Sequence, residues 1–286
     1  MPGERGIGEP GWVRVALVLA SIAVFAVMLA MPLAVVFTEA LSKGWQFALD
    51  ALSDPDALAA IWLTLLVALI VVPLNTAFGL AAAWCIVHFR FPGRALLVAL
   101  VELPFAVSPV ISGMIYVLLF GRQGWLGPLL AAHGVKIVFA LPGIVLATTF
   151  VTLPFVARQL VPLMQAQGTD EEEAALTLGA GGWQVFRRVT LPKVRWALLT
   201  GMLLCNARSM GEFGAVSVVS GHIRGLTNTM PLHVQILYNG YDIAGAFAMS
   251  ALLACLGLAT LALRELLAWR ARRAEGCGAQ AVLVPA

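Results

Sequence analysis

The sequence predicts an all-α, polytopic membrane protein with six transmembrane helices, because the chain is apolar, poor in charge and divided into long apolar stretches. Of its 286 residues, 60% are hydrophobic and 12% are charged, and the mean hydropathy is +0.91. A soluble domain usually carries about 25% charged residues. This composition therefore argues against a soluble enzyme, a disordered chain or a disulfide-rich secreted domain. The net charge of +3 gives no indication of nucleic-acid binding.

Six apolar stretches are long enough to cross a bilayer core, which needs about 20 helical residues. The predicted spans are 15–37, 60–87, 95–120, 137–157, 197–219 and 244–269. Prolines inside the second, third and fourth stretches predict kinks rather than ends, because neighbouring helices can satisfy the freed backbone groups. The first stretch exceeds the apolar core of a signal peptide, about 7–15 residues, so we interpret it as a retained helix.

The distribution of basic residues predicts the orientation of the chain. The N-terminus, the loops after the second and fourth spans and the C-terminus together hold 13 Lys and Arg residues. The other side holds Lys43, Arg122, Lys136 and Arg224. Because cytoplasmic loops are enriched in Lys and Arg, residues 1–14 and the tail 270–286 are predicted to be cytoplasmic. We expect the tail to be disordered.

One long cytoplasmic loop, residues 158–195, separates the fourth and fifth spans and contains nine charged residues. Thr169 and Glu172 have the spacing of a capping box at the start of a helix, and Gly179 suits the left-handed residue that ends one. A second short helix is expected over 183–188, with a turn toward the membrane at Pro192.

The function of this loop is open on local rules alone. A helix-turn-helix that only connects two spans would satisfy the pattern. However, the loop is longer than a connection requires and carries apolar side chains that no domain of this chain covers, namely Leu176, Leu178, Trp183 and Phe186. These residues predict either a docking surface for another protein or contact with the membrane interface.

The same loop resembles the EAA loop of ABC importer permeases. Glu173-Ala174-Ala175 is followed after three residues by Gly179 and after nine more by Val189-x-Leu191-Pro192, and every spacing fits. The resemblance implies a type I ABC importer (MetI-like) permease core over 15–269, in which this loop is a coupling helix for an ATP-hydrolysing subunit. It assigns coupling to the motif residues and to Trp183 beside them.

Further stretches resemble sulfate and molybdate permeases, and in particular the CysW-type subunit of sulfate/thiosulfate importers. They are Leu103-Pro104-Phe105-Ala106-Val107-Ser108-Pro109, Phe91-Pro92-Gly93-Arg94, the run 182–192, the run 206–221 and Ile223-Arg224-Gly225. The resemblance covers roughly residues 55–270. It implies a bacterial inner-membrane location, two ATPase copies, a second homologous permease and a periplasmic binding protein, besides membrane lipid. Sulfate, thiosulfate, molybdate and tungstate all remain possible substrates.

No catalytic residue or metal site is predicted in this chain. A P-loop needs GxxxxGK[ST], and the residues after Lys43, Lys136 and Lys193 are neither Ser nor Thr. ATP and Mg²⁺ are therefore expected on the partner ATPase, with no cofactor on this chain. The four cysteines form no CxxC pair and are interpreted as packing residues.

Three ionisable residues lie inside predicted spans, where charge is costly. Arg208 and Glu212 are four residues apart and are expected on one face of the fifth helix, with Ser209 beside them. Two interpretations compete. In the first, the two residues neutralise each other at a bundle interface. In the second, Arg208 lends positive potential to a passing oxyanion, and Glu212 holds the Arg208 side chain in its orientation.

Two residues of the third span complete the candidate translocation path. Glu102 is interpreted either as an interfacial residue or as a partner for a basic group of a second permease. Ser108 lies at a predicted kink with exposed backbone near a pore. An ion-gradient-driven transporter would have to use Glu102 and Glu212 as its ion site and would leave the EAA loop unexplained. A membrane scaffold without transport is a further alternative. Intramembrane hydrolysis has no motif to support it.

Overall fold

A computed structural model describes the chain over residues 11–281, with side chains over 12–270. These residues form helices and loops, and no strand occurs among them. The helices are α1 (Gly11–Phe25), the π-helical η1 (Ala26–Ala30), α2 (Met31–Ala40), α3 (Trp45–Ser53), α4 (Pro55–His88), α5 (Arg94–Ala106), α6 (Pro109–Phe120), α7 (Gly127–Ala132), α8 (Leu141–Thr152), α9 (Pro154–Gln167), α10 (Asp170–Thr177), α11 (Gly182–Val185), the π-helical η2 (Phe186–Thr190), α12 (Leu191–Met210), α13 (Gly214–Val219), α14 (Met230–Asn239) and α15 (Ile243–Ala281).

Four helices of the described region are long and apolar enough to cross a membrane, or five if one bent pair counts as a single span. They run over Trp12–Ala40, Pro55–His88, Leu141–Gln167 and Ile243–Arg270. They correspond to the first, second, fourth and sixth predicted spans. The all-α membrane class is confirmed, whereas the count of six complete spans is not.

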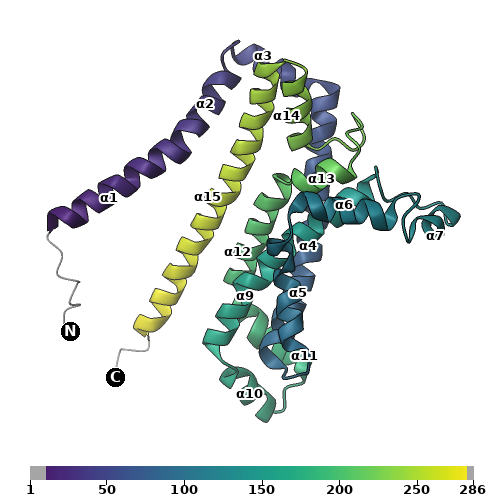
Figure 1. The fold of residues 1–286 in the computed structure, drawn as a ribbon. Coiled ribbons are helices and arrows are strands. Elements are labelled where there is room, and N and C mark those ends of the chain that lie inside the picture. The colour runs from purple at the N-terminus through teal and green to yellow at the C-terminus, as the bar shows by residue number, and fades with distance from the viewer. Residues whose placement is uncertain (1–10, 282–286) are drawn as a thin grey trace.

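The third predicted span is broken rather than kinked. Helices α5 and α6 meet at an angle of 107°. Ser108 is extended, with a ψ of 133°, because a residue that precedes a proline is disfavoured in the helical region. Pro109 then begins α6, where its missing N–H costs nothing. The prediction of one helix over 95–120 is therefore wrong, and α6 runs across the bundle instead of along it (Figure 1).

The fifth predicted span also has the wrong boundaries. Helix α12 begins at Leu191, ends at Met210, and is followed by a separate short helix, α13. Helix α13 packs along α6, and the contact is close because a Cβ on Gly113 would lie 2.7 Å from the Ala215 carbonyl oxygen. The two interrupted stretches thus end in a pair of helices that cross the bundle together.

The bundle is centred on α4, α9 and α12, and two glycines allow the three helices to approach. A Cβ added to Gly79 of α4 would lie 2.7 Å from Val156 Cβ of α9. A Cβ on Gly201 of α12 would lie 3.1 Å from Val156 Cα. Val156 and Leu160 are fully buried between them. These contacts make α9 the common neighbour of the helices on either side of it.

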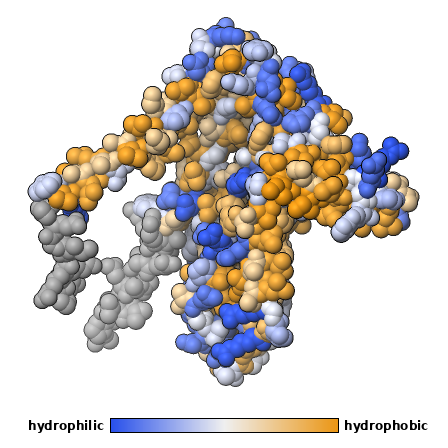
Figure 2. All heavy atoms as spheres, viewed as in Figure 1, coloured by the Kyte–Doolittle hydropathy of each residue, from blue (hydrophilic) through white to orange (hydrophobic). Residues whose placement is uncertain are grey.

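The two ends of the chain differ in how they contact the bundle. Helix α2 packs on α15, whereas α1 diverges from the bundle (Figure 1) and exposes Leu17, Ile22 and Phe25. Figure 2 shows hydrophobic residues across the middle of the visible face and hydrophilic residues gathered near α10 and α11. Helix α15 continues to Ala281, so most of the segment for which we expect disorder is helical. Residues 1–10 and 282–286 lie outside the described region.

Candidate coupling and translocation sites

The loop between the fourth and fifth spans is shorter than predicted, because α9 continues to Gln167. The loop proper therefore begins at Gly168, whose φ of +68° suits a glycine. The capping box predicted for α10 does not form. The Thr169 hydroxyl donates instead to Glu173 Oε1 at 2.8 Å, and no side-chain cap is present. Four acidic residues still occupy the first turn of α10, where the helix dipole favours negative charge.

Gly179 ends α10 as predicted, with a left-handed φ of +85°. The Ala180 N–H donates to the Ala175 carbonyl at 3.0 Å and the Leu178 N–H donates to the Ala174 carbonyl at 3.1 Å. These bonds satisfy carbonyls that the end of the helix leaves without partners. Helix α11 then begins, and the Gly181 N–H donates to Gln184 Oε1 at 3.1 Å.

Pro192 does not mark a turn, and this part of the prediction is wrong. From Gly182 to Met210 the chain is helical without a break, through α11, η2 and α12. A proline in a helix has no N–H and crowds the preceding turn. The structure meets this with the π-helical η2 just before it, in which the Leu191 N–H donates to the Phe186 carbonyl five residues earlier.

The predicted coupling residues lie on an exposed surface with a groove. Leu178 is 89% exposed and Trp183 is 71% exposed. The groove, of about 660 Å³, lies between α10 and the start of α12 and is lined by Glu171, Ala174, Ala175, Leu178, Arg188, Val189, Pro192, Lys193 and Arg195. Thus Ala174, Ala175 and Pro192 of the motif line the groove. Glu173 is exposed beside it, and Leu191 is half-buried.

Phe186 is not exposed as predicted, because aromatic contacts hold it against α4. Its ring lies 5.3 Å from that of Trp84 and stacks on Trp183 at 5.4 Å. Trp84 in turn stacks on His88 at 4.0 Å. The exposed Trp183 is therefore the outer member of a row of rings that begins at the end of α4.

The sequence prediction missed the role of Glu172. This carboxylate is only 6% exposed. Thr190 Oγ1 of η2 donates to Glu172 Oε1 at 2.9 Å, and His88 Nε2 of α4 lies 3.5 Å from Glu172 Oε2. We call Glu172, Thr190 and His88 the Glu172 junction. It joins α10 to the end of α4 and to the last residue of η2, directly before α12.

The second candidate site is the corner between α12 and α13, which contains Arg208 and Glu212. Arg208 Nη1 lies 2.6 Å from Glu212 Oε2, and Glu212 is 2% exposed. The two residues do not share a helical face as predicted, because α12 ends at Met210. Glu212 Oε1 accepts instead from the Ala215 N–H at 3.0 Å. The carboxylate therefore binds both Arg208 and the first turn of α13.

Two of the other predicted path residues, Ser209 and Ser108, lie at or near this corner. Ser209 is buried and donates to the Asn206 carbonyl at 2.9 Å. Ser108 is exposed at the break between α5 and α6. A Cβ on Gly214 would lie 3.0 Å from Pro109 Cβ, so the residue after Ser108 contacts the start of α13, two residues after Glu212.

Glu102 lies elsewhere. It is exposed on α5 and lines a cavity of about 280 Å³ between α5 and α9, together with Ile86, Val98, Val101, Ala157, Arg158, Val161 and Pro162. The Arg158 guanidinium lies 4.8 Å from the Phe105 ring centre. The structure thus places Glu102 near a basic residue that the sequence assigned to the cytoplasmic loop.

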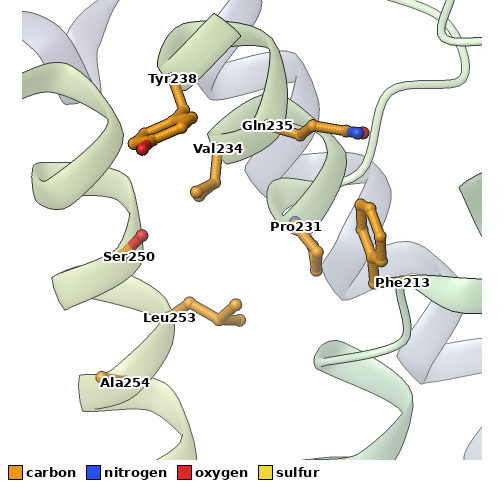
Figure 3. Close-up of a pocket in the computed structure, with 8 residues that line it drawn as sticks. All are labelled: Phe213, Pro231, Val234, Gln235, Tyr238, Ser250, Leu253 and Ala254. Atoms are coloured by element: carbon orange, nitrogen blue, oxygen red, sulfur yellow. The ribbon is translucent and has the colours of Figure 1, made fainter. Parts of the chain in front are cut away.

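An apolar pocket of about 540 Å³ lies beside the Glu212 corner (Figure 3). Its lining comprises Phe213, Pro231, Val234, Gln235, Tyr238, Ser250, Leu253 and Ala254. Val234 and Tyr238 of α14 project toward Ser250 and Leu253 of α15. None of these side chains is charged, so the pocket offers apolar contact and no electrostatic attraction for an anion.

Two further buried polar groups were not predicted. Asn75 of α4 is fully buried, and its Nδ2 donates to Thr152 Oγ1 at 2.7 Å and to the Thr149 carbonyl at 3.2 Å. His233 of α14 is buried beside Asn228, whose Nδ2 lies 3.2 Å from His233 Nδ1. Burial lowers the pKa of His233, and the charges of Asp56 and Asp54 oppose that shift.

Comparisons with known proteins agree on one family. A family model for binding-protein-dependent transport system inner membrane components matches residues 75–273. The sulfate transport system permease protein CysW of Escherichia coli K12 is 52% identical over 252 residues, covering 88% of this chain and 87% of that protein. The sulfate transport system permease protein CysT of Salmonella typhimurium is 36% identical over 234 residues, covering 82% and 84%.

Solved structures share the fold. One is a chain in the crystal structure of a bacterial alginate ABC transporter in complex with an alginate pentasaccharide-bound periplasmic protein. The TM-score is 0.75, the sequence identity is 17%, and the match covers 91% of this chain and 94% of the other. At this identity the likeness concerns the arrangement of helices alone.

Proposed function

The chain belongs to the family of binding-protein-dependent transport system inner membrane components, and on that premise we propose how it works as the permease subunit of an ABC sulfate importer. It is a multi-pass inner-membrane protein and, like its relatives, a permease rather than an enzyme. In our proposal, a partner ATPase docks on the exposed loop 168–192, and the Glu212 corner forms part of the anion path.

The observation that carries the coupling role is the groove between α10 and α12. Its walls are formed by the small residues Ala174 and Ala175 on one side and Pro192 on the other, with Leu178 projecting at the rim. Small side chains leave room for a partner, and an exposed leucine and tryptophan supply apolar area for it. The Arg188, Lys193 and Arg195 side chains of the lining would favour an acidic partner surface.

The energy for transport comes, in this proposal, from ATP and Mg²⁺ bound to two copies of that ATPase. The chain has no P-loop sequence of its own. A second homologous permease completes the pore, and a similarity to both CysW and CysT relatives supports a pair of different chains. A periplasmic binding protein delivers the anion, as the family description implies.

Both termini are proposed to be cytoplasmic. The first turn of α1, the C-terminal part of α15 and α10 lie on the side of the molecule away from α3 and α14 (Figure 1). The excess of Lys and Arg in the segments on that side supports the same orientation.

Co-purification with the ATPase subunit tests the coupling proposal. Gly179→Asp forces a side chain into a left-handed position, whereas Gly182→Asp adds the same charge to the first residue of α11, where an acidic side chain is favoured. We expect Gly179→Asp to lower ATPase retention and sulfate uptake and Gly182→Asp to leave both unchanged. Normal retention and uptake in Gly179→Asp would exclude this loop as the coupling element.

The path role of Arg208 is tested by separating charge balance from anion contact. Arg208→Ala leaves Glu212 buried without its partner, so a loss of uptake could reflect folding alone. The double variant Arg208→Gln/Glu212→Gln removes both charges together, so the positive charge is lost without leaving an unpaired carboxylate buried. We expect low uptake in both variants with normal ATPase recruitment. Recovery of uptake in the double variant would assign the pair a purely structural role.

Uptake of labelled sulfate, with thiosulfate, molybdate and tungstate as competitors and the cognate binding protein present, tests the substrate. We propose that sulfate and thiosulfate compete and that molybdate and tungstate do so weakly. No charged side chain lines the apolar pocket beside the corner, so this chain supplies little basis for discrimination. Substrate choice is then expected to follow the binding protein when binding proteins are exchanged.

A further inference from the structure

We propose that Glu172 is a positioning residue that makes α4 follow the movement of the coupling loop. The inference rests on the proposed function, because it assumes that an ATPase moves this loop. It concerns a residue outside the EAA motif, which begins at Glu173. The Glu172 junction would convert a displacement of α10 into a displacement of α4 and of the start of α12.

Glu172 is the polar connection between α10 and α4 among the described residues. Among the hydrogen bonds and ion pairs of the described residues, the contact of Glu172 with His88 is the one that joins these helices. The Glu171–Lys193 ion pair, at 3.6 Å, joins α10 to α12 instead, and Glu171 is exposed. Without the Glu172 contact, α10 would be linked to α4 indirectly, through its chain connection to α9 and through α11, η2 and α12, which contact α4 or its neighbours.

His88 is held in one orientation by contacts within its own helix. Its Nδ1 lies 3.3 Å from the Trp84 carbonyl oxygen, one turn earlier in α4. Its ring stacks on the Trp84 ring with an interplanar angle of 13°. A side chain fixed on two sides by its own helix cannot adapt freely to a moving carboxylate, so a force on Glu172 is passed to the backbone of α4.

The other oxygen of the Glu172 carboxylate accepts a hydrogen bond from Thr190. Thr190 is 1% exposed, and its hydroxyl donates to Glu172 across an interval of 18 residues. Thr190 is the last residue of η2, directly before α12. One carboxylate therefore contacts the end of α4 with one oxygen and the start of α12 with the other. Glu172 Oε2 and His88 Nε2 are both buried without a hydrogen-bond partner. Because such atoms are costly to bury, their approach to 3.5 Å is the polar contact that each has available.

The test uses the complete transporter, with its second permease, ATPase and binding protein, reconstituted in liposomes. Glu172→Gln removes the charge but keeps an oxygen for Thr190, and Glu172→Ala removes both contacts. Asp170→Asn is the matched control, because it removes one charge from an exposed position in the same turn of α10. The measurements are the ATPase retained, the sulfate transported per ATP hydrolysed, and the stimulation of hydrolysis by the binding protein.

We expect the Glu172 variants to retain the ATPase but to transport about fivefold or more less sulfate per ATP, in the range typical of coupling between sites. Asp170→Asn should match the wild type. A merely structural role would lower the amount of assembled complex and leave transport per ATP unchanged, which would overturn the proposal. Loss of the ATPase from the wild-type chain itself would instead contradict the proposed function.

A second pair of variants covers the case in which Glu172→Ala does not assemble. Thr190→Ser keeps the hydroxyl and should transport normally, whereas Thr190→Val keeps the shape and should be uncoupled. Amide hydrogen exchange measures directly whether α4 responds when α10 moves. ATP should change the exchange of residues 84–88 in the wild type but not in Glu172→Gln, while residues 170–177 respond in both. An equal response of residues 84–88 in both proteins would refute the connection.

Discussion

Glu172 and Glu212 are both buried carboxylates at junctions between helices, but the contacts of Glu212 are local in the chain and those of Glu172 are long-range. Glu212 contacts Arg208 four residues earlier and the Ala215 N–H three residues later. Glu172 contacts Thr190 and His88, which are 18 and 84 residues away in the chain. The first carboxylate stabilises a local change of direction in one segment, whereas the second joins α10 to residues of α4 and η2 that are distant in the chain.

A buried glutamate can therefore either fix the local direction of the backbone, as Glu212 does, or join helices that are distant in the chain, as Glu172 does. A local pair maintains the corner between α12 and α13 whatever the rest of the protein does. A long-range contact depends on the relative position of three helices and is sensitive to their movement. Removal of Glu212 should therefore affect folding, and removal of Glu172 should affect coupling more than folding.

The largest effect is expected when the local pair is broken. Arg208→Ala leaves the buried Glu212 carboxylate without its charge partner, which should lower the free energy of unfolding by about 3–5 kcal/mol. Denaturant unfolding in mild detergent measures this change. Arg208→Gln/Glu212→Gln is the control and should recover most of the loss. A loss that persists in the double variant would show that the charge pair is not what stabilises the corner.

A smaller effect on stability is expected at the Glu172 junction. Glu172→Ala leaves the buried Thr190 hydroxyl without an acceptor and should lower the free energy of unfolding by about 1–3 kcal/mol. The same unfolding assay applies. If the loss equalled that of Arg208→Ala, the distinction between a shape-defining and a connecting carboxylate would not hold.

Backbone geometry in the loop gives a still smaller effect. Gly179→Ala places a Cβ at a φ of +85°, with no neighbouring atom within 4 Å, so only backbone strain is added, about 1–2 kcal/mol. Gly182→Ala, also without neighbours but at the start of α11, should be neutral or slightly stabilising. Equal thermal stability of the two variants would contradict this assignment.

The smallest effect concerns His233, a buried group at the other end of the bundle. Because burial lowers its pKa below the ordinary value of 6.5, the unfolded state binds the proton more readily. Stability should therefore fall as the pH drops below 6.5 and be unaffected by this group above it, by at most about 1.4 kcal/mol per pH unit. His233→Gln should flatten that slope between pH 7.5 and 5.5, as measured by thermal unfolding. An unchanged slope would assign the pH dependence to other groups.

The sequence predicted what depends on composition or on short spacing. The apolar stretches identified the membrane class, and Gly179 marked the end of α10 through its need for a left-handed backbone. The break at Ser108 was underestimated, although Pro109 was noted, because local preference for an extended residue does not give the size of the bend. The boundary at Gly211 was missed because the apolar residues of α13 extended the predicted span past it, although the polar segment from Asn206 to Glu212 marks the interruption.

The contacts of Glu172 were beyond sequence reasoning for a different reason. Thr169 and Glu172 match a capping box, and the local rule assigns the carboxylate to the helix terminus. Thr190 and His88 offer it partners that only the tertiary fold brings near. Asn75 is similar, since it interrupts an apolar stretch for no local reason and binds Thr152 across the bundle.

The π-helical segment η2 also constrains the number of residues between α11 and α12. Each residue turns an α-helix by about 100°, and η2 contains one residue more than ordinary α-helical bonding would require. Deleting a single residue within 186–190 would let α11 and α12 join as a regular helix. A single-residue deletion within α12, which leaves η2 in place, would instead rotate Trp183 by about 100° relative to the part of α12 beyond the deletion. Exchange of this loop between transporters is therefore governed by residue count as much as by residue identity.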